Sequence, residues 1–202
     1  MPEYARTFLH DVAEIATHLP VDRLEAMAAG LAKVRDAGGR LFILGVGGGA
    51  GHASHAVNDF RKIAHFEAYA PTDNVSELTA RINDDGWDTT FSAWLRTSRL
   101  CERDAVLVFS VGGGSREHGI SLNLVQGVEL ARSVGAKVYG IVGRPDGTTA
   151  QLADEVIVVP TPAKRQTPLV ESFQAVVWHL LVSHPLLAAQ EGKWEDATAS
   201  PA

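Results

Sequence analysis

Histidine and aspartate recur at helical spacing in the segment GVGGGAGHASHAVNDF, which spans residues 45–60. Residues of a helix advance by about 100° each, so His52, His55 and Asp59 fall within an arc of roughly 60°. His55 and Asp59 stand four positions apart and can reach one ion or one substrate. Such groups bind metals or move protons, although a single surface histidine is more often simply solvated.

A second pair of this kind lies near the C-terminus, in VESFQAVVWHLL. Glu171 and His179 lie opposite the apolar stripe of a predicted helix. Eight residues separate them, which is about 12 Å along a helix axis. Two long side chains would have to lean together to share one small ligand, and contributions from different subunits would relieve that strain.

Two glycine-rich loops, GVGGGAG from Gly45 and SVGGGS from Ser110, each follow an apolar run and precede a helical pattern. Without Cβ atoms, the backbone can aim N–H groups at an anion, aided by the helix N-terminus. Serine hydroxyls can donate to the same anion. Two such loops favour a phosphate or phosphosugar site over ordinary turns. The residues predicted to bind substrate here are Gly47, Gly48, Gly49, Ser110, Gly112, Gly113, Gly114 and Ser115.

A nucleotide site is the alternative for the first loop. Gly45, Gly47 and Ala50 match the G-x-G-x-x-A pattern, and Glu67 lies at a suitable distance for a ribose contact. However, Glu67 begins a predicted strand rather than ending one, and the chain has no room for a separate substrate domain. Both features disfavour a nucleotide-dependent oxidoreductase.

The elements that must position these residues alternate between strands and helices. Apolar runs bounded by glycine or proline predict buried strands at 40–46, 104–111, 137–143 and 154–160, with a shorter strand at 67–71. Helical periodicity covers residues 3–37 as two helices, then 51–64, 74–84, 89–100, 117–134 and 168–190. This alternation predicts an α/β fold, a three-layer αβα sandwich around a parallel sheet, with ligands beyond the carboxyl ends of the strands.

Length and composition suit one domain. The chain has 202 residues, 46% hydrophobic and 21% charged, with a net charge of -6. The sequence contains no polybasic run, so nucleic acid is not an obvious partner. The single cysteine, Cys101, excludes a disulfide framework within the chain and fits a reducing cytoplasm. Neither a signal peptide nor a membrane span is expected. We expect a single domain over residues 1–192 and a disordered tail over 193–202.

In this order, these residues resemble the sugar isomerase (SIS) fold and, within it, the phosphoheptose isomerases. That family interconverts sedoheptulose 7-phosphate and D-glycero-D-manno-heptose 7-phosphate. The resemblance covers nearly the whole chain. It consists of two N-terminal helices, the GVGGG loop, His55-x-x-x-Asp59, Asn83-Asp84-Asp85-Gly86, the Ser110–Ser115 loop, Leu152-Ala153-Asp154, Glu171 and His179.

The resemblance implies roles at the reacting end of a substrate. His55 matches a histidine that ligates zinc in some members, and Asp59 matches a glutamate taken as both ligand and catalytic base. Glu171 matches a glutamine, and His179 matches a histidine regarded as the partner acid or base. The implied zinc ligands are therefore His55, Asp59, Glu171 and His179, and the implied catalytic residues are Asp59, Glu171 and His179.

The resemblance also implies how substrate and subunits are arranged. Ser110 and Ser115 match serines that bind phosphate, and Asn83 and Asp84 match a pair that contacts the substrate. Family members are homotetramers with active sites between subunits, so a homotetramer is expected here.

Three departures from the family pattern bear on the substrate. GVGGG replaces G-N-G-G-S, Gly112 replaces a third loop serine, and Asp59 is one methylene shorter than glutamate. The expected activity is aldose–ketose isomerisation of a sugar phosphate through an enediol, with zinc as the expected cofactor. The alternative is a non-catalytic phosphosugar-binding regulator. The lost polar residues favour that alternative, whereas the acid at Asp59 together with Glu171 and His179 favours the enzyme.

Overall fold

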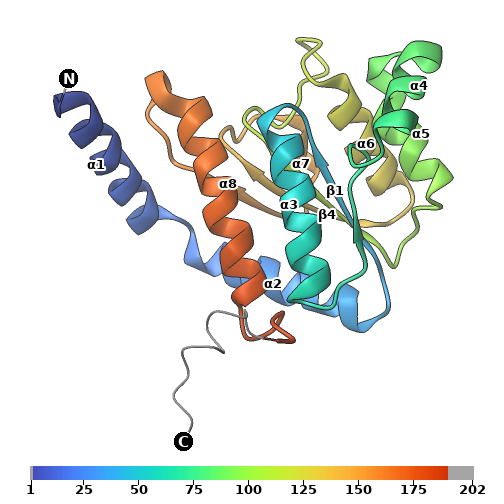
Figure 1. Cartoon of the computed structure of the whole chain (residues 1–202), viewed down its shortest axis with the longest axis horizontal. Coiled ribbons are helices and arrows are strands. Elements are labelled where there is room, and N and C mark those ends of the chain that lie inside the picture. The colour runs from blue at the N-terminus through green and yellow to red at the C-terminus, as the bar shows by residue number, and fades with distance from the viewer. Residues whose placement is uncertain (1, 191–202) are drawn as a thin grey trace, which may run out of the picture.

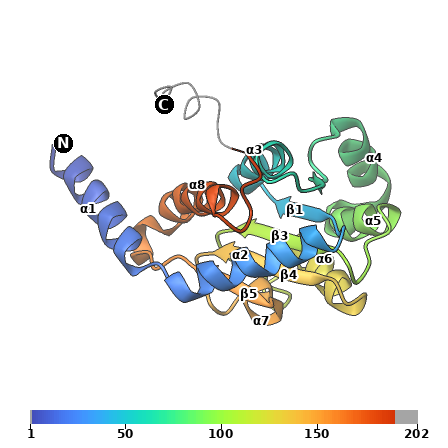
Figure 2. The same ribbon diagram turned by 90° about the horizontal axis from the view of Figure 1, so that it is seen from below.

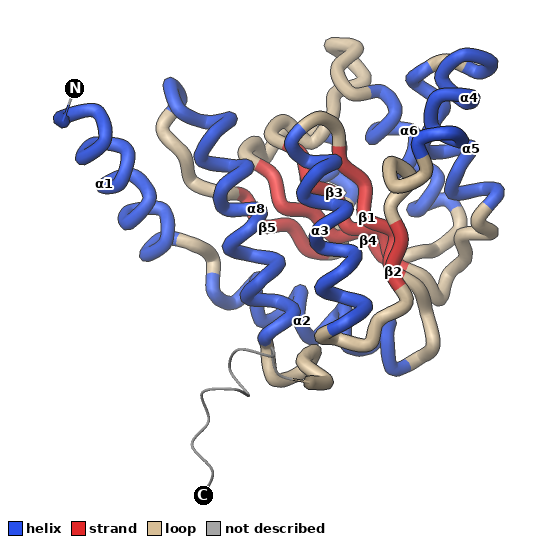
Figure 3. The backbone as a smooth tube through the Cα atoms, viewed as in Figure 1, coloured by secondary structure: helices blue, strands red, loops and turns tan. Residues whose placement is uncertain are grey.

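Five parallel strands form one sheet with helices on both faces, as the computed structural model in Figures 1 and 3 shows. The structure describes residues 2–190. The strand order is β2-β1-β3-β4-β5. The strands span Leu41–Gly45 (β1), Ala68–Tyr69 (β2), Ala105–Ser110 (β3), Lys137–Val142 (β4) and Glu155–Val158 (β5). The predicted α/β class is therefore confirmed, and each predicted strand is present.

The strand order brings the two glycine loops together. β1 pairs with β2 on one side and with β3 on the other, and Gly45 at the end of β1 is in register with Phe109 in β3. The strand that follows β1 in sequence, β2, is thus added on one side of β1, whereas β3, β4 and β5 are added in turn on the other side. Ligands of open α/β sheets bind beyond the carboxyl ends of strands at such a reversal. Both loops emerge there.

One face of the sheet is covered by α2 (Val21–Asp36), α3 (Gly48–Lys62) and α8 (Gln166–Ser183). The apolar stripes of these helices bury against the sheet, whose inward-facing residues there include Leu41, Ile43 and Phe109. α1 (Pro2–His18) leads away from the body of the domain, and α3 and α8 lie side by side (Figures 1 and 2).

The other face is covered by α5 (Thr90–Thr97), α6 (Leu122–Ser133) and the short α7 (Thr148–Leu152). α4 (Val75–Asp85) packs on α5 and buries none of its residues. The short 3₁₀ helices η1 (Trp87–Thr89) and η2 (Ala163–Arg165) precede α5 and α8. Asn74 caps α4, since its side chain accepts the Glu77 N–H over 3.3 Å.

Two predicted helix boundaries are wrong by about five residues or more. α6 begins at Leu122 rather than near residue 117, because residues 115–120 form a separate excursion closed by two backbone hydrogen bonds of 2.9 Å between Ser115 and Ile120. α8 ends at Ser183 rather than near residue 190. His184 is extended, as the residue before Pro185 tends to be, and Pro185 has no N–H to continue the helix. The tail predicted at 193–202 lies outside the described residues.

An ion pair fastens the starts of β1 and β3 to each other. Asp104 is 2% exposed and accepts hydrogen bonds from Arg40 at 2.7, 3.0 and 3.1 Å, and from the Cys101 N–H. Burial alone would raise the pKa of the Asp104 carboxyl, but these donors outweigh it and hold that pKa below its ordinary value. Within residues 2–190, no helix combines the length and apolarity needed to cross a membrane.

Candidate active site

Two neighbouring helices bring three of the predicted site residues together. α3 buries Ala53, Ala56 and Phe60, which leaves its polar edge beside α8. α8 buries Val177 and Leu181 and presents His179 at the same seam. His55, Asp59 and His179 each offer one ligand atom there, and these atoms all lie within 4.8 Å of one another.

The Asp59 carboxylate is the centre of this His/Asp cluster, by which we mean His55, Asp59 and His179. Its Oδ2 lies 3.4 Å from Nε2 of His55 and 3.5 Å from Nε2 of His179. Asp59 is 6% exposed, whereas the side chains of His55 and His179 are 57% and 52% exposed. The carboxylate thus forms the floor of the cluster, and the imidazoles form its solvent-facing wall.

Neighbouring hydrogen bonds fix the cluster's donors and acceptors. Nδ1 of His179 lies 2.7 Å from the Ala175 carbonyl oxygen, which can only accept, so Nδ1 carries the proton. In the neutral ring, Nε2 then turns a lone pair toward Asp59. The carboxylate itself accepts from Asn58 at 3.0 Å and from the Trp178 indole N–H at 3.1 Å. The Nε2 lone pair and the carboxylate converge, an arrangement that a cation stabilises.

The donor set fits zinc. Two imidazole nitrogens and one carboxylate oxygen are ligands that zinc accepts, and three protein ligands with one open position are the usual arrangement in catalytic zinc sites. The hydrogen bond from Nδ1 of His179 to a backbone carbonyl is the usual partner contact of a zinc-binding histidine.

Glu171 does not join the cluster within one protomer. It lies near the opposite end of α8, where its carboxylate covers the N-terminus of α3. A Cβ placed on Gly48 would come within 2.7 Å of the Glu171 carboxylate atoms. The positive end of the helix dipole favours an acid at this place. His52, on the same arc as His55, is also absent from the cluster, because its Nδ1 lies 2.9 Å from the Gln174 side-chain oxygen.

The second glycine loop is held in a fixed shape. The Ser110 hydroxyl accepts the Gly113 N–H over 3.0 Å, and the carbonyls of Gly113 and Gly114 accept from the first residues of α7. Among the described residues, the N–H groups of Gly112 and Gly114 have no acceptor. Backbone N–H groups left free in a tight loop form a concavity suited to an anion.

A cleft of about 540 Å³ lies beside this loop. Gly112, Gly114 and Ser115 line one side of it, and Arg144 lies among the residues of the β4–α7 connection. The Arg144 guanidinium donates hydrogen bonds to Asp146 and holds the pKa of that carboxyl below its ordinary value. The cleft therefore combines free N–H groups with the Arg144–Asp146 ion pair.

Ser121 is a residue that the sequence patterns did not single out. The excursion at 115–120 folds back, so the Ser121 carbonyl oxygen lies 3.5 Å from a Cβ placed on Gly114. Ser121 stands at the N-cap of α6, but its hydroxyl makes no capping bond. By contrast, Ser115 Oγ accepts the His118 N–H within the excursion. The sequence did contain evidence against a helix from residue 117, because Gly119 lies inside that segment and glycine disfavours a helix interior.

Asn83 and Asp84 lie away from both groups of residues. They are exposed on the last turn of α4, and their side chains bond to each other over 2.8 Å. α4 stands at the far end of the molecule from α8 (Figures 1 and 2). One protomer therefore does not bring this pair to the His/Asp cluster.

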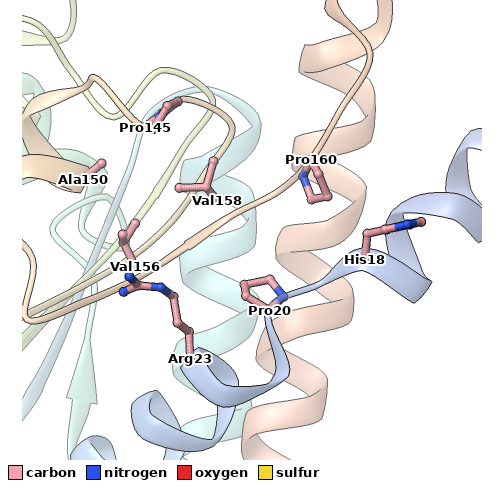
Figure 4. Close-up of a pocket in the computed structure, with 8 residues that line it drawn as sticks. All are labelled: His18, Pro20, Arg23, Pro145, Ala150, Val156, Val158 and Pro160. Atoms are coloured by element: carbon pink, nitrogen blue, oxygen red, sulfur yellow. The ribbon is translucent and has the colours of Figure 1, made fainter.

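A separate pocket of about 370 Å³ opens between the α1–α2 junction and β5, as Figure 4 shows. Its lining residues are His18, Pro20, Arg23, Pro145, Ala150, Val156, Val158 and Pro160. None of the predicted site residues is among them, so this pocket is separate from the candidate site.

Known proteins share this architecture. No family model matches the chain. The phosphoheptose isomerase of Neisseria gonorrhoeae has the same fold, with a TM-score of 0.78 at 22% identity over 90% of this chain and 97% of that one. The chain is 34% identical over 192 residues to the lincomycin biosynthesis protein LmbN of Streptomyces lincolnensis, covering 89% of this chain and 68% of that protein. It is 33% identical over 150 residues to the phosphoheptose isomerase of Rhodospirillum rubrum, covering 72% and 74%.

The parallel sheet, its strand order and its flanking helices define an α/β domain of the SIS class. Within that class, the chain belongs to the phosphoheptose isomerase family.

Proposed function

We propose that this protein is an aldose–ketose isomerase of a sugar phosphate, with sedoheptulose 7-phosphate as its substrate and D-glycero-D-manno-heptose 7-phosphate as its product. The observation that carries the proposal is the convergence of His55, Asp59 and His179 across α3 and α8 in a member of this family. Relatives named phosphoheptose isomerase support the choice of substrate.

The reaction moves a proton between two neighbouring carbons. A base removes the proton beside the carbonyl, which gives a cis-enediol, and an acid returns a proton to the adjacent carbon. Asp59 or Glu171 serves as the base, and His179 is its acid partner. Two groups on opposite sides of the substrate are needed, and a carboxylate with an imidazole meets that need.

The cluster also supports a zinc site. His55, Asp59 and His179 would hold the ion, and bound zinc would supply Lewis acidity toward the substrate carbonyl in place of the His179 acid, with Glu171 as the base. Glu171 and His179 lie on one helix, about 12 Å apart along its axis. A homotetramer with sites between subunits, in which a neighbour contributes Glu171, is therefore part of the proposal.

The phosphate binds at the carboxyl ends of β1 and β3. The free N–H groups of Gly112 and Gly114, with the Ser110 and Ser121 hydroxyls, are suited to hold it. Binding energy from this end positions the sugar at the reacting end. Gly47, Gly48 and Gly49 line the same edge of the sheet, and Asn83 and Asp84 remain predicted substrate contacts.

The deciding experiment is isomerisation of sedoheptulose 7-phosphate by purified, zinc-replete protein, followed by chromatography of the two heptose phosphates. Formation of the aldose is the expected result. Absence of turnover with that ketose and with pentulose and hexulose phosphates would exclude the enzyme. Tight binding of a sugar phosphate without turnover would favour a regulator that binds phosphosugars.

A further inference from the structure

We propose that Trp178 is a positioning residue of the His/Asp cluster, which sets the Asp59 carboxylate through its indole N–H. The indole nitrogen lies 3.1 Å from Asp59 Oδ2. That same oxygen is the one that faces Nε2 of His55 and of His179. The inference rests on the proposed function, because it concerns the same cluster.

Trp178 cannot turn away from Asp59 without cost. The side chain is 2% exposed, and its bond to Asp59 joins two buried groups. A buried N–H that loses its only acceptor keeps the full cost of its desolvation. The native direction of the indole N–H is therefore strongly preferred.

Packing from the sheet sets the plane of the indole ring. Trp178 stacks on Phe109 near the end of β3, with 5.7 Å between ring centroids. On other sides it meets the rings of His52 and His55, at 5.1 and 5.4 Å. His52 is in turn held by Gln174. The ring thus links the end of β3 to the cluster.

The indole N–H of Trp178 occupies one lone pair of the Asp59 carboxylate. Each carboxylate oxygen has about two acceptor positions. Asn58 donates to Oδ1 and Trp178 donates to Oδ2, so the remaining position on Oδ2 is the one turned toward the two imidazoles. An aspartate that ligates an ion can swing about two side-chain bonds. A buried, ring-packed donor restricts that motion.

The test removes the N–H while keeping the ring. Trp178→Phe deletes the donor, and replacement of Trp178 by 3-benzothienylalanine puts sulfur in its place with little change in shape. Zn²⁺ alone is titrated against a chromophoric chelator, and Co²⁺ alone is followed by its visible absorption. Loss of such a partner weakens metal affinity by about 10–100-fold, so both changes should lower Zn²⁺ affinity by that factor and alter the Co²⁺ spectrum.

Trp94→Phe is the matched control. Trp94 packs edge-on against Phe42 in the core on the other face of the sheet, and this change should leave both metal readouts unaltered. Native Zn²⁺ affinity and a native Co²⁺ spectrum in the benzothienylalanine protein would overturn the inference, even if Trp178→Phe fails to fold. Absence of Zn²⁺ and Co²⁺ binding by the unsubstituted protein would instead overturn the zinc site of the proposed function, and this inference with it.

Discussion

Nε2 of His179 lies 3.5 Å from Oδ2 of Asp59. Helices α3 and α8 therefore meet at one cluster, although most of the chain separates them in sequence. A carboxylate and an imidazole lone pair this close can share an ion.

Replacement of His179 by alanine should lower kcat/KM for sedoheptulose 7-phosphate by about 10²–10⁴-fold, the contribution of a positioned acid or base. The side chain is 52% exposed, so the thermal midpoint of the zinc-free protein should change little. His10→Ala is the control, because His10 is exposed on α1. Equal activity of the two variants would remove His179 from the mechanism.

Zinc should bind the unsubstituted protein and stabilise it. Ligand at about 100 times its dissociation constant adds about 2.7 kcal/mol to the free energy of unfolding, which a thermal melt with and without Zn²⁺ can measure. His55→Ala should reduce that gain, since it removes one of three ligands. His118→Ala, on the excursion, should retain it in full. An identical zinc-dependent shift in both variants would contradict the ligand assignment.

Ser121→Ala should raise KM for the sugar phosphate more than Ser115→Ala does. The Ser121 hydroxyl is free at the N-cap of α6, whereas Ser115 Oγ is engaged by the His118 N–H. One hydrogen bond to a charged group is worth about 1.5–3 kcal/mol, so an increase of about 10–100-fold is expected. Steady-state kinetics of the two variants measure the two KM values. A larger increase for Ser115→Ala would show that Ser115, and not Ser121, binds the phosphate.

Gly49→Ser, which restores a family-like serine, should destabilise the protein. A Cβ at Gly49 would lie 2.5 Å from the Phe109 carbonyl oxygen at the end of β3, so the loop would have to shift. Overpacking of this kind costs about 1–3 kcal/mol. Gly51→Ser, two residues along α3, meets no atom within 4 Å and should be neutral or stabilising. Urea unfolding measures the free energy of unfolding of the two variants. Equal values would show that the loop can shift to accommodate the Gly49 side chain without cost.

Asp104→Asn should lower the free energy of unfolding at neutral pH by about 2–4 kcal/mol, because it leaves Arg40 without its partner charge. The pKa of Asp104 is lowered by folding. Its contribution is thus complete above the unfolded pKa of about 3.9 and disappears as pH falls through the folded value. Urea unfolding from pH 7 to pH 3 should show the gap between wild type and variant closing.

The exposed Asp88→Asn should show no such gap at any pH. A gap for Asp104→Asn that stays constant down to pH 3 would contradict the lowered pKa.

Local patterns were enough to predict the layers of this fold. Apolar runs bounded by glycine mark β1 and β3, because strands buried on both faces need apolar residues throughout. The predicted start of α6 was wrong, because helical propensity at residues 117–121 competes with Gly119 and with the pairing of Ser115 and Ile120, a contact that no local pattern reports.

The sequence by itself determined the α/β class, the two glycine loops at strand ends and the polar arc of α3 that carries His55 and Asp59, since these depend on spacing within single elements. Only the tertiary structure decided which residues meet. Packing of α3 against α8 joined His179 to Asp59, placed Trp178 beneath them and left Glu171 at the opposite end of the helix. Contacts between distant segments depend on strand order and helix packing, and periodicity within one segment carries no information about either.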